Sequence, residues 1–109
     1  MEKTLDIINK ALKKIKSKDI NIIEVERLTQ MMNYMIICTA TSNTHADAIS
    51  KNLKLTVKNS GIKILGMEGQ SNSGWILVDL GDIVIHIMLK EMREFYQLEK
   101  LWINPKTDG

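Results

Sequence analysis

Residues 75–89 read Trp-Ile-Leu-Val-Asp-Leu-Gly-Asp-Ile-Val-Ile-His-Ile-Met-Leu, and this stretch decides the fold of the chain. Two aliphatic runs rich in β-branched residues are separated by Gly81-Asp82, which is typical of a β-hairpin with a two-residue turn. Such a turn fixes the register of the two strands, and the register fixes which side chains share a face. One predicted face carries the pairs Leu80–Ile83, Val78–Ile85 and Ile76–Ile87, and the other carries Asp79–Val84, Leu77–His86 and Trp75–Met88.

The two predicted faces differ in character. The first is wholly aliphatic, so we expect it to be core. The second is mixed and allows two interpretations. Either it packs under another element with His86 and Asp79 locally hydrogen-bonded, or it is partly exposed and presents Trp and Met side chains of the kind that protein-binding surfaces favour.

Upstream of the hairpin, the pattern predicts a strand, a helix and another strand. Residues 34–38 form a short, continuously apolar run that suits an interior strand buried on both faces. A polar loop follows, and Thr44 with Asp47 resembles a capping box at the start of a helix. Gly61 predicts the end of this helix, and residues 62–67 predict the next strand.

The two ends of the chain complete the pattern. Apolar residues recur at steps of three and four over residues 2–17, which predicts an amphipathic helix. Residues 20–25 predict a strand, residues 28–33 a loop, and residues 90–101 a final helix. A hairpin beside a strand–helix–strand crossover predicts an α/β fold, with a mixed five-stranded sheet and flanking helices.

Length and composition limit the classes of protein. The 109 residues, 44% hydrophobic and 26% charged, are typical of one globular domain, which we expect to span residues 1–109. No apolar run approaches the roughly 20 residues of a membrane helix, and the single Cys fits a reducing compartment. We therefore expect a cytoplasmic protein without a membrane partner.

Charge is unevenly distributed along the chain. Residues 1–18 carry six lysines against two acids, and residues 51–63 carry four lysines and no acid. Residues 64–103 carry six acids and three basic residues. These clusters are typical of solvated helix faces, although the acidic last third would suit a basic partner.

The Cys, His and Asp residues of the chain do not form the pattern of an active site. Cys38 has no second Cys nearby and lies in the most apolar strand, so we expect a buried, unreactive thiol. His45 and His86 have no further ligands at metal-binding spacing. Asp79 and Asp82 flank a tight turn, where Asp is common for conformational reasons, although such a pair could hold Mg²⁺. We predict no catalytic residue, metal or cofactor.

Three blocks of the sequence resemble the ribosomal silencing factors, also called the iojap family. The blocks are residues 34–42 with His45 and Ala46; residues 66–69 with 75–88; and residues 93–102. Their order and spacing resemble the family over almost the whole chain. The chain departs from the family pattern at Asn33, Ala40 and Thr44.

The resemblance implies both a fold and a function. The implied fold is nucleotidyltransferase-like, without the catalytic acids of those enzymes. The implied function is translation regulation or ribosome assembly: binding to the large ribosomal subunit through ribosomal protein uL-fourteen, steric exclusion of the small subunit, and repression of translation when nutrients are scarce. Two further partners are expected: a second copy of the chain in a homodimer, and rRNA in peripheral contact with the lysines.

With this resemblance, the mixed face of the hairpin becomes the candidate docking surface. We expect Trp75, Leu80 and Tyr96 to be its apolar anchors, Asp79, Asp82 and Glu99 to be polar partners of basic groups, and Met88 to belong to the same docking surface. Two alternatives come from other classes: a phosphotransfer enzyme using Asp79, Asp82 and the 39–44 loop, and an RNA-binding module using the lysine clusters. The five aromatic residues are not interleaved with those lysines, so the RNA-binding module ranks last.

Overall fold

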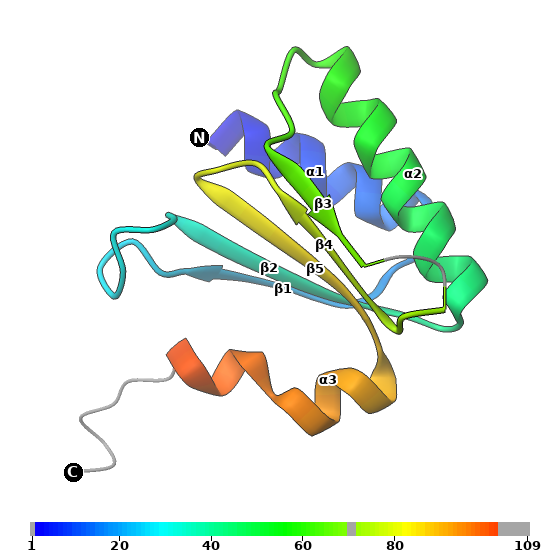
Figure 1. Ribbon diagram of the computed structural model, residues 1–109. Coiled ribbons are helices and arrows are strands. Elements are labelled where there is room, and N and C mark those ends of the chain that lie inside the picture. Colours follow the sequence, from blue (N-terminus) through cyan, green and yellow to red (C-terminus); the bar gives the residue numbers. More distant parts are fainter. Residues whose placement is uncertain (1, 70–71, 103–109) are drawn as a thin grey trace, which may run out of the picture.

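Five strands form one mixed sheet in the order β1-β2-β5-β4-β3 in this computed structural model, which describes residues 2–69 and 72–102 (Figure 1). The strands are β1 (Lys18–Glu24), β2 (Tyr34–Ala40), β3 (Gly66–Glu68), β4 (Trp75–Asp79) and β5 (Ile83–Leu89). The helices are α1 (Glu2–Lys14), α2 (Asn43–Asn59) and α3 (Lys90–Tyr96), followed by a 3-10 turn η1 (Leu98–Trp102). The predicted order of elements and the mixed α/β class are confirmed.

The β4–β5 hairpin has the predicted register. Its antiparallel pairs run from Trp75 opposite Met88 to Asp79 opposite Val84, and the N–H of Leu80 donates to the carbonyl of Ile83 at 2.9 Å. Since partners directly opposite share a face, the predicted division into an aliphatic and a mixed face holds.

The β2–β5 pair is parallel, whereas the other neighbouring strands are antiparallel. Helix α2 makes the crossover that a parallel connection requires. Its N-cap is Ser42, whose side chain accepts from the N–H of His45 at 3.0 Å, so the predicted start at Thr44 is wrong. The helix ends as predicted, with Gly61 in the left-handed region at φ +78°.

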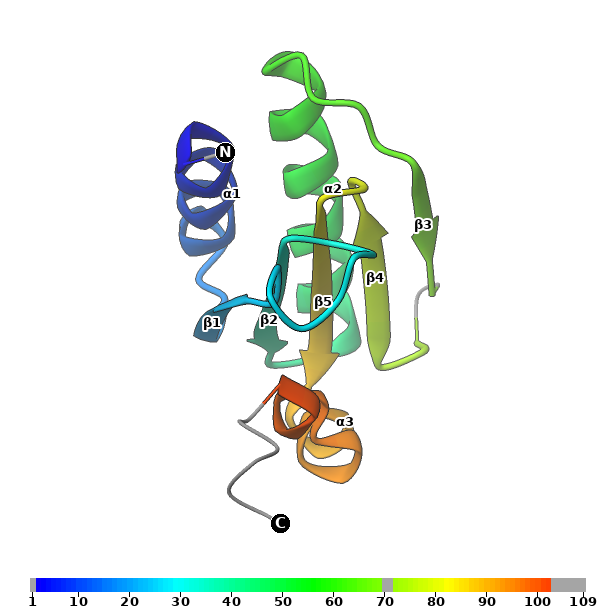
Figure 2. The same ribbon diagram turned by 90° about the vertical axis from the view of Figure 1, so that its left-hand side faces the viewer.

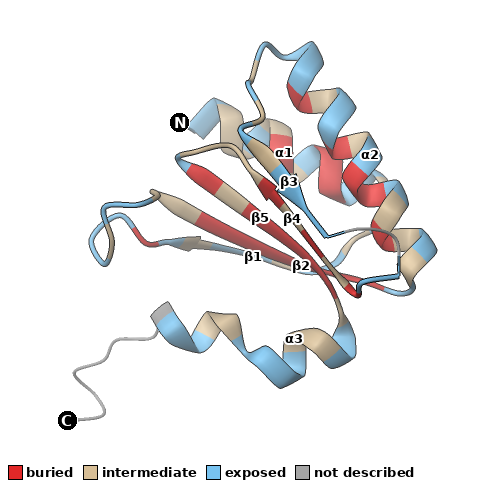
Figure 3. Cartoon of the chain, viewed as in Figure 1, coloured by how far each residue is buried: buried red, intermediate tan, exposed pale blue. Residues whose placement is uncertain are grey.

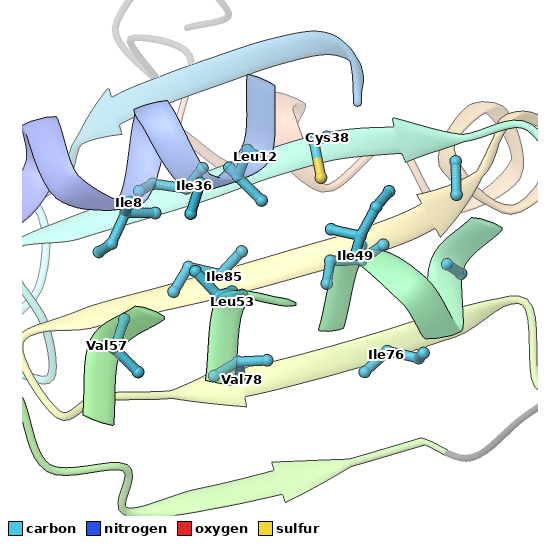
Figure 4. Packing of buried hydrophobic residues seen from close by; sticks show 14 of the residues in the cluster. Ile8, Leu12, Ile36, Cys38, Ile49, Leu53, Val57, Ile76, Val78 and Ile85 are labelled. Atoms are coloured by element: carbon cyan, nitrogen blue, oxygen red, sulfur yellow. The ribbon is translucent and has the colours of Figure 1, made fainter. Parts of the chain in front are cut away.

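The aliphatic face of the sheet is the main core, and α1 and α2 cover it (Figure 2). Ile76, Val78 and Ile85 point from the strands toward Leu53 of α2 and Leu12 of α1 (Figure 4). Five residues of the hairpin on this face are buried: Ile76, Val78, Ile83, Ile85 and Ile87. This confirms the aliphatic face as core.

Several predicted boundaries need correction. The first helix ends at Lys14 rather than at residue 17, because Lys16 turns the backbone into the left-handed region at φ 59°. Strand β3 covers Gly66–Glu68 only, instead of residues 62–67. The final helix breaks at Gln97, whose φ of 48° is also left-handed, and the chain continues as η1.

No helix in the described part of the chain is long and apolar enough to cross a membrane. The likeness to nucleotidyltransferases stays a prediction.

Candidate functional site

The mixed face of the sheet is largely buried over β2 and β5 and only partly buried over β4, as the colours of Figure 3 indicate. Met88 is fully buried there beside Met35 and Ile37 of β2. Met92 of α3 and Leu98 of η1 pack against this second cluster. Each of the two interpretations of the mixed face therefore describes one part of it.

Arg93 fastens the covering layer, α3 with η1, to the sheet. Its Nε and Nη2 donate to the two carboxylate oxygens of Glu99, both at 3.0 Å. Its Nη1 donates to the carbonyl of Asp19 at 2.6 Å and to the hydroxyl of Thr39 at 2.8 Å. Asn21 of β1 donates to the same Glu99 carboxylate at 2.9 Å, so the clamp joins both β1 and β2 to η1.

Two predicted docking residues are corrected by this arrangement. The side chain of Met88 is fully buried, so it supports the surface from below and does not form it. The carboxylate of Glu99 already has a basic partner inside the chain, and its hydrogen bonds with Arg93 lower the pKa of that carboxyl. Glu99 therefore holds the covering layer in place.

His86 and Trp75 are linked at the boundary between the covered and open parts. The indole Nε1–H of Trp75 donates to Nδ1 of His86 at 3.0 Å. An imidazole that accepts at Nδ1 is neutral with its hydrogen on Nε2. Burial lowers the pKa of His86 to about 4, which keeps the acceptor available near neutral pH. His86 thus fixes the orientation of the indole.

Three aromatic side chains, Trp75, Phe95 and Tyr96, form what we call the aromatic patch. The rings of Trp75 and Tyr96 are 4.9 Å apart between centroids, and those of Phe95 and Tyr96 are 5.0 Å apart and edge to face. Phe95 is 78% exposed and Tyr96 is 48% exposed. Helix α3 has no buried residue of its own, so its aromatic side chains are displayed to solvent.

A hollow of about 310 Å³ lies beside the aromatic patch. Trp75, Leu77 and Met92 contribute apolar wall, and Glu68 contributes a carboxylate. Glu68 pairs with Leu77 across β3 and β4, which puts both on the mixed face. An aliphatic stem carrying a cationic head would suit this combination of apolar wall and acid.

The remaining predicted residues lie at the other end of the hairpin. Strand β4 separates Trp75 from Asp79 by roughly 13 Å at the usual rise per residue. Asp79 accepts from the N–H of Gly81 at 2.8 Å, Asp82 is exposed, and Leu80 packs partly against the main core. The structure therefore brings Trp75 and Tyr96 together and leaves Asp79, Leu80 and Asp82 as a separate group.

The phosphotransfer alternative required Asp79 and Asp82 to meet the 39–44 loop. That loop follows the C-terminal end of β2, whereas the carbonyl of Asp82 accepts from the N–H of Tyr34 at the N-terminal end of β2. The length of a seven-residue strand is about 20 Å, so the two groups lie at opposite ends of the sheet. The constellation on which this alternative rested is not assembled. Within the described ranges, no group of three potential metal-ligating His, Cys, Asp or Glu side chains occurs.

Cys38 is buried as expected, and His45 has a structural role. Cys38 is fully buried, and burial raises the pKa of its thiol to about 11. His45 accepts from the N–H of Thr41 at 2.9 Å, and its Nε2 donates to the carbonyl of Ile15 at 2.6 Å. It therefore joins the chain after α1 to the start of α2.

Sequence reasoning missed the clamp residue Arg93 and the exposure of Phe95. The six-residue separation of Arg93 and Glu99 is not a helical pairing distance, and it becomes close only because Gln97 breaks the helix. The exposure of Phe95 could have been predicted. Phe95 and Tyr96 are neighbours on a helix, so their side chains point in different directions and a single buried face cannot hold both.

A family model and several known proteins similar to this chain point to the same family. The family model described as ribosomal silencing factor during starvation matches residues 1–108. Ribosomal silencing factors of Chromobacterium violaceum and Haemophilus influenzae are each 39% identical to this chain, over 84% of this chain and 75% of the relative in the first case and 90% and 96% in the second. A mouse relative named mitochondrial assembly of ribosomal large subunit protein 1 is 34% identical, over 90% of this chain and 44% of that protein.

The fold is shared as well. A crystal structure of a Chromobacterium violaceum protein superimposes with a TM-score of 0.91 at 35% identity, covering 94% of this chain and 85% of that one. Sequence and fold agree over nearly the entire length, and on that ground the chain belongs to the ribosomal silencing factor family.

Proposed function

We propose that this protein binds the large ribosomal subunit at its subunit-joining face, keeps the small subunit from joining, and so represses translation when nutrients are scarce. It acts by occupying space and without catalysis, in the cytoplasm. Family membership carries the ribosomal part of this proposal, and the name of the mouse relative supports the large subunit as the partner.

The aromatic patch is the proposed contact with ribosomal protein uL-fourteen. Exposed aromatic side chains that are held rigidly make strong anchors in protein interfaces, because they bury large areas and lose little conformational freedom. Trp75 is held by His86 and by Tyr96. A preorganised anchor of this kind is the single observation that carries the docking site.

Acids beside the aromatic patch and at the hairpin turn suit a basic partner. Glu68 lies beside Trp75 in the hollow, and Asp82 is exposed at the hairpin turn near Leu80. Complementary charge raises the rate of association and fixes orientation more than it raises affinity. We assign Asp79, Leu80 and Asp82 to a second, peripheral contact at the turn.

The lysines of α1 have a secondary place in the proposal. Lys13 and Lys14 are exposed near the end of this helix, and they meet solvent or neighbouring rRNA phosphate. A homodimer of the free protein is a further prediction.

The test compares two matched apolar-to-acid substitutions. Phe95→Glu puts a charge on the aromatic patch, and Leu55→Glu puts the same charge on α2, where Leu55 is 60% exposed. Both variants and the unmodified protein are centrifuged through sucrose with separate large and small subunits. We expect the unmodified protein and Leu55→Glu to sediment with large subunits only. Phe95→Glu should lose at least about thirtyfold in affinity, because hot-spot anchors contribute about 2 kcal/mol or more.

Each outcome has a distinct meaning. If Phe95→Glu binds like the unmodified protein, the partner is kept and the docking site is wrong. If the unmodified protein fails to sediment with large subunits at moderate salt, the proposed function itself is wrong. In a second assay, excess protein added before mixing the subunits should lower the yield of joined ribosomes, and an unchanged yield would contradict the exclusion mechanism.

A further inference from the structure

A groove of about 640 Å³ runs between the C-terminal half of α2 and the segment that leads into β3. It lies on the α-helical side of the sheet, since its residue Met67 pairs with Val78 of the aliphatic face. The aromatic patch is associated with the opposite, mixed face. The groove is lined by Lys54, Lys58, Gly61, Ile62, Lys63, Ile64 and Met67.

The rim of the groove is positively charged without internal compensation. Residues 48–67 contain no Asp or Glu. Among residues 2–69 and 72–102, no ion pair links Lys54, Lys58 or Lys63 to a carboxylate. Lys51, one turn earlier on α2, does have a partner in Asp47 at 3.1 Å. The uncompensated charge is therefore concentrated where the groove is.

The walls of the groove are aliphatic. Ile62 and Ile64 are only partly buried, and Met67 is 38% exposed. None of the described residues that line the groove is aromatic, so a nucleic acid base would find no stacking surface there. Met67 also belongs to β3, which is an edge strand of the sheet that the described residues form. Apolar walls, a basic rim and an adjacent strand edge favour a peptide over a polynucleotide.

We propose that this groove binds an acidic segment of a partner protein, in which aliphatic side chains alternate with or flank Asp and Glu. The aliphatic side chains would pack against Ile62, Ile64 and Met67, and the carboxylates would pair with Lys54, Lys58 and Lys63. Recognition of short segments by an apolar groove with charged edges is a recurring mode of protein binding. The partner is distinct from the one proposed for the aromatic patch, which is basic.

The test uses the isotope-labelled full chain and three probes in amide NMR titrations. The probes are a short peptide of repeating Glu-Glu-Leu units, the same peptide with Ser in place of Leu, and oligouridine of similar length. We expect the Leu peptide to bind most tightly and to shift the amide signals of Ile62, Ile64 and Met67. Lys54→Glu/Lys58→Glu should weaken that binding about tenfold, whereas Lys13→Glu/Lys14→Glu, an equal charge change on α1, should leave it within about twofold.

Several results would overturn the proposal. If the Ser peptide binds as tightly as the Leu peptide, binding is due to charge alone and the aliphatic walls of the groove play no part. Tighter binding of oligouridine would assign the lysines to RNA. Shifts of these signals that grow with protein concentration alone would assign the groove to a second copy of the chain. The mapping on the unmodified protein does not depend on any variant folding, and Lys54→Glu/Lys58→Glu should still sediment with large subunits, so this proposal and the proposed function fail separately.

Discussion

Arg93 and Glu99 form a bidentate ion pair. Between them in the sequence lies Gln97, whose left-handed backbone conformation turns the chain from α3 into η1. The pair closes a short loop between α3 and η1, and Arg93 extends the contact to Asp19 and Thr39. Since α3 has no buried residue of its own, this clamp is a main reason why α3 and the aromatic patch stay on the sheet.

Removal of one partner of the clamp should destabilise the protein. Glu99→Ala leaves the mostly buried Arg93 side chain without its carboxylate, and the expected loss in the free energy of unfolding is about 1–3 kcal/mol. Glu94→Ala removes an exposed acid from the same helix, and it should change stability by less than about 0.5 kcal/mol. Urea unfolding at neutral pH measures both, and equal effects of the two variants would contradict the clamp.

The clamp should also weaken in acid. The folded protein holds the pKa of Glu99 below its ordinary value through the Arg93 hydrogen bonds. The stabilisation is therefore fully present above the ordinary pKa of about 4.3 and is lost as the pH falls through the lower, folded-state value. The stability difference between the unmodified protein and Glu99→Ala should shrink over this acidic range. A difference that stays constant to low pH would argue against this origin.

Residues 75–89 show which parts of the structure the sequence could predict. Alternation and a two-residue turn determine register locally, so the hairpin pairs and the aliphatic face are as expected. Trp75 and Met88 are direct partners on one face, yet Met88 is fully buried and Trp75 is not. That difference depends on where the chain goes after β5, which Gln97 and the Arg93 clamp decide, and neither has a local sequence signal.

His86 should make the protein less stable as the pH falls from about 6.5 to about 4. Burial lowers the pKa of His86 to about 4 in the folded protein, whereas the unfolded chain binds a proton near pH 6.5. The unfolded state therefore binds more protons in this window, and the loss should reach a few kcal/mol, about 3 at most. His86→Gln keeps an acceptor for Trp75 without a titrating ring.

The free energy of unfolding as a function of pH checks this prediction. The profile of His86→Gln should be flatter than that of the unmodified protein between about pH 6.5 and pH 4. His45 is present in both proteins and serves as an internal constant. Parallel profiles would mean that the buried imidazole does not control the acid sensitivity.

Asp79 should behave as a turn residue and not as a metal ligand. Its carboxylate accepts from the N–H of Gly81, whose φ of +92° lies in the left-handed region. Asp79→Asn keeps an oxygen acceptor and should be close to neutral, whereas Asp79→Ala should cost about 1 kcal/mol. Thermal unfolding with millimolar Mg²⁺ and ATP should show no increase in midpoint. A clear increase that Asp79→Asn abolishes would revive the phosphotransfer alternative.

Cys38 should be unreactive in the folded protein. Its side chain is fully buried beneath the helices of the main core, and its pKa is raised to about 11. The thiolate is the reactive form of cysteine, and at pH 8 its equilibrium fraction in the folded protein is about one in a thousand. A thiol reagent such as a disulfide dye should label the native chain only at the rate at which the protein opens, and should label it rapidly in denaturant.

The labelling rate of Glu99→Ala separates two routes by which a reagent could reach the Cys38 thiol. If release of α3 and η1 exposes the thiol, this variant should be labelled much faster than the unmodified protein. Because Cys38 faces α1 and α2 on the opposite side of the sheet, we expect acceleration only in proportion to the loss of global stability.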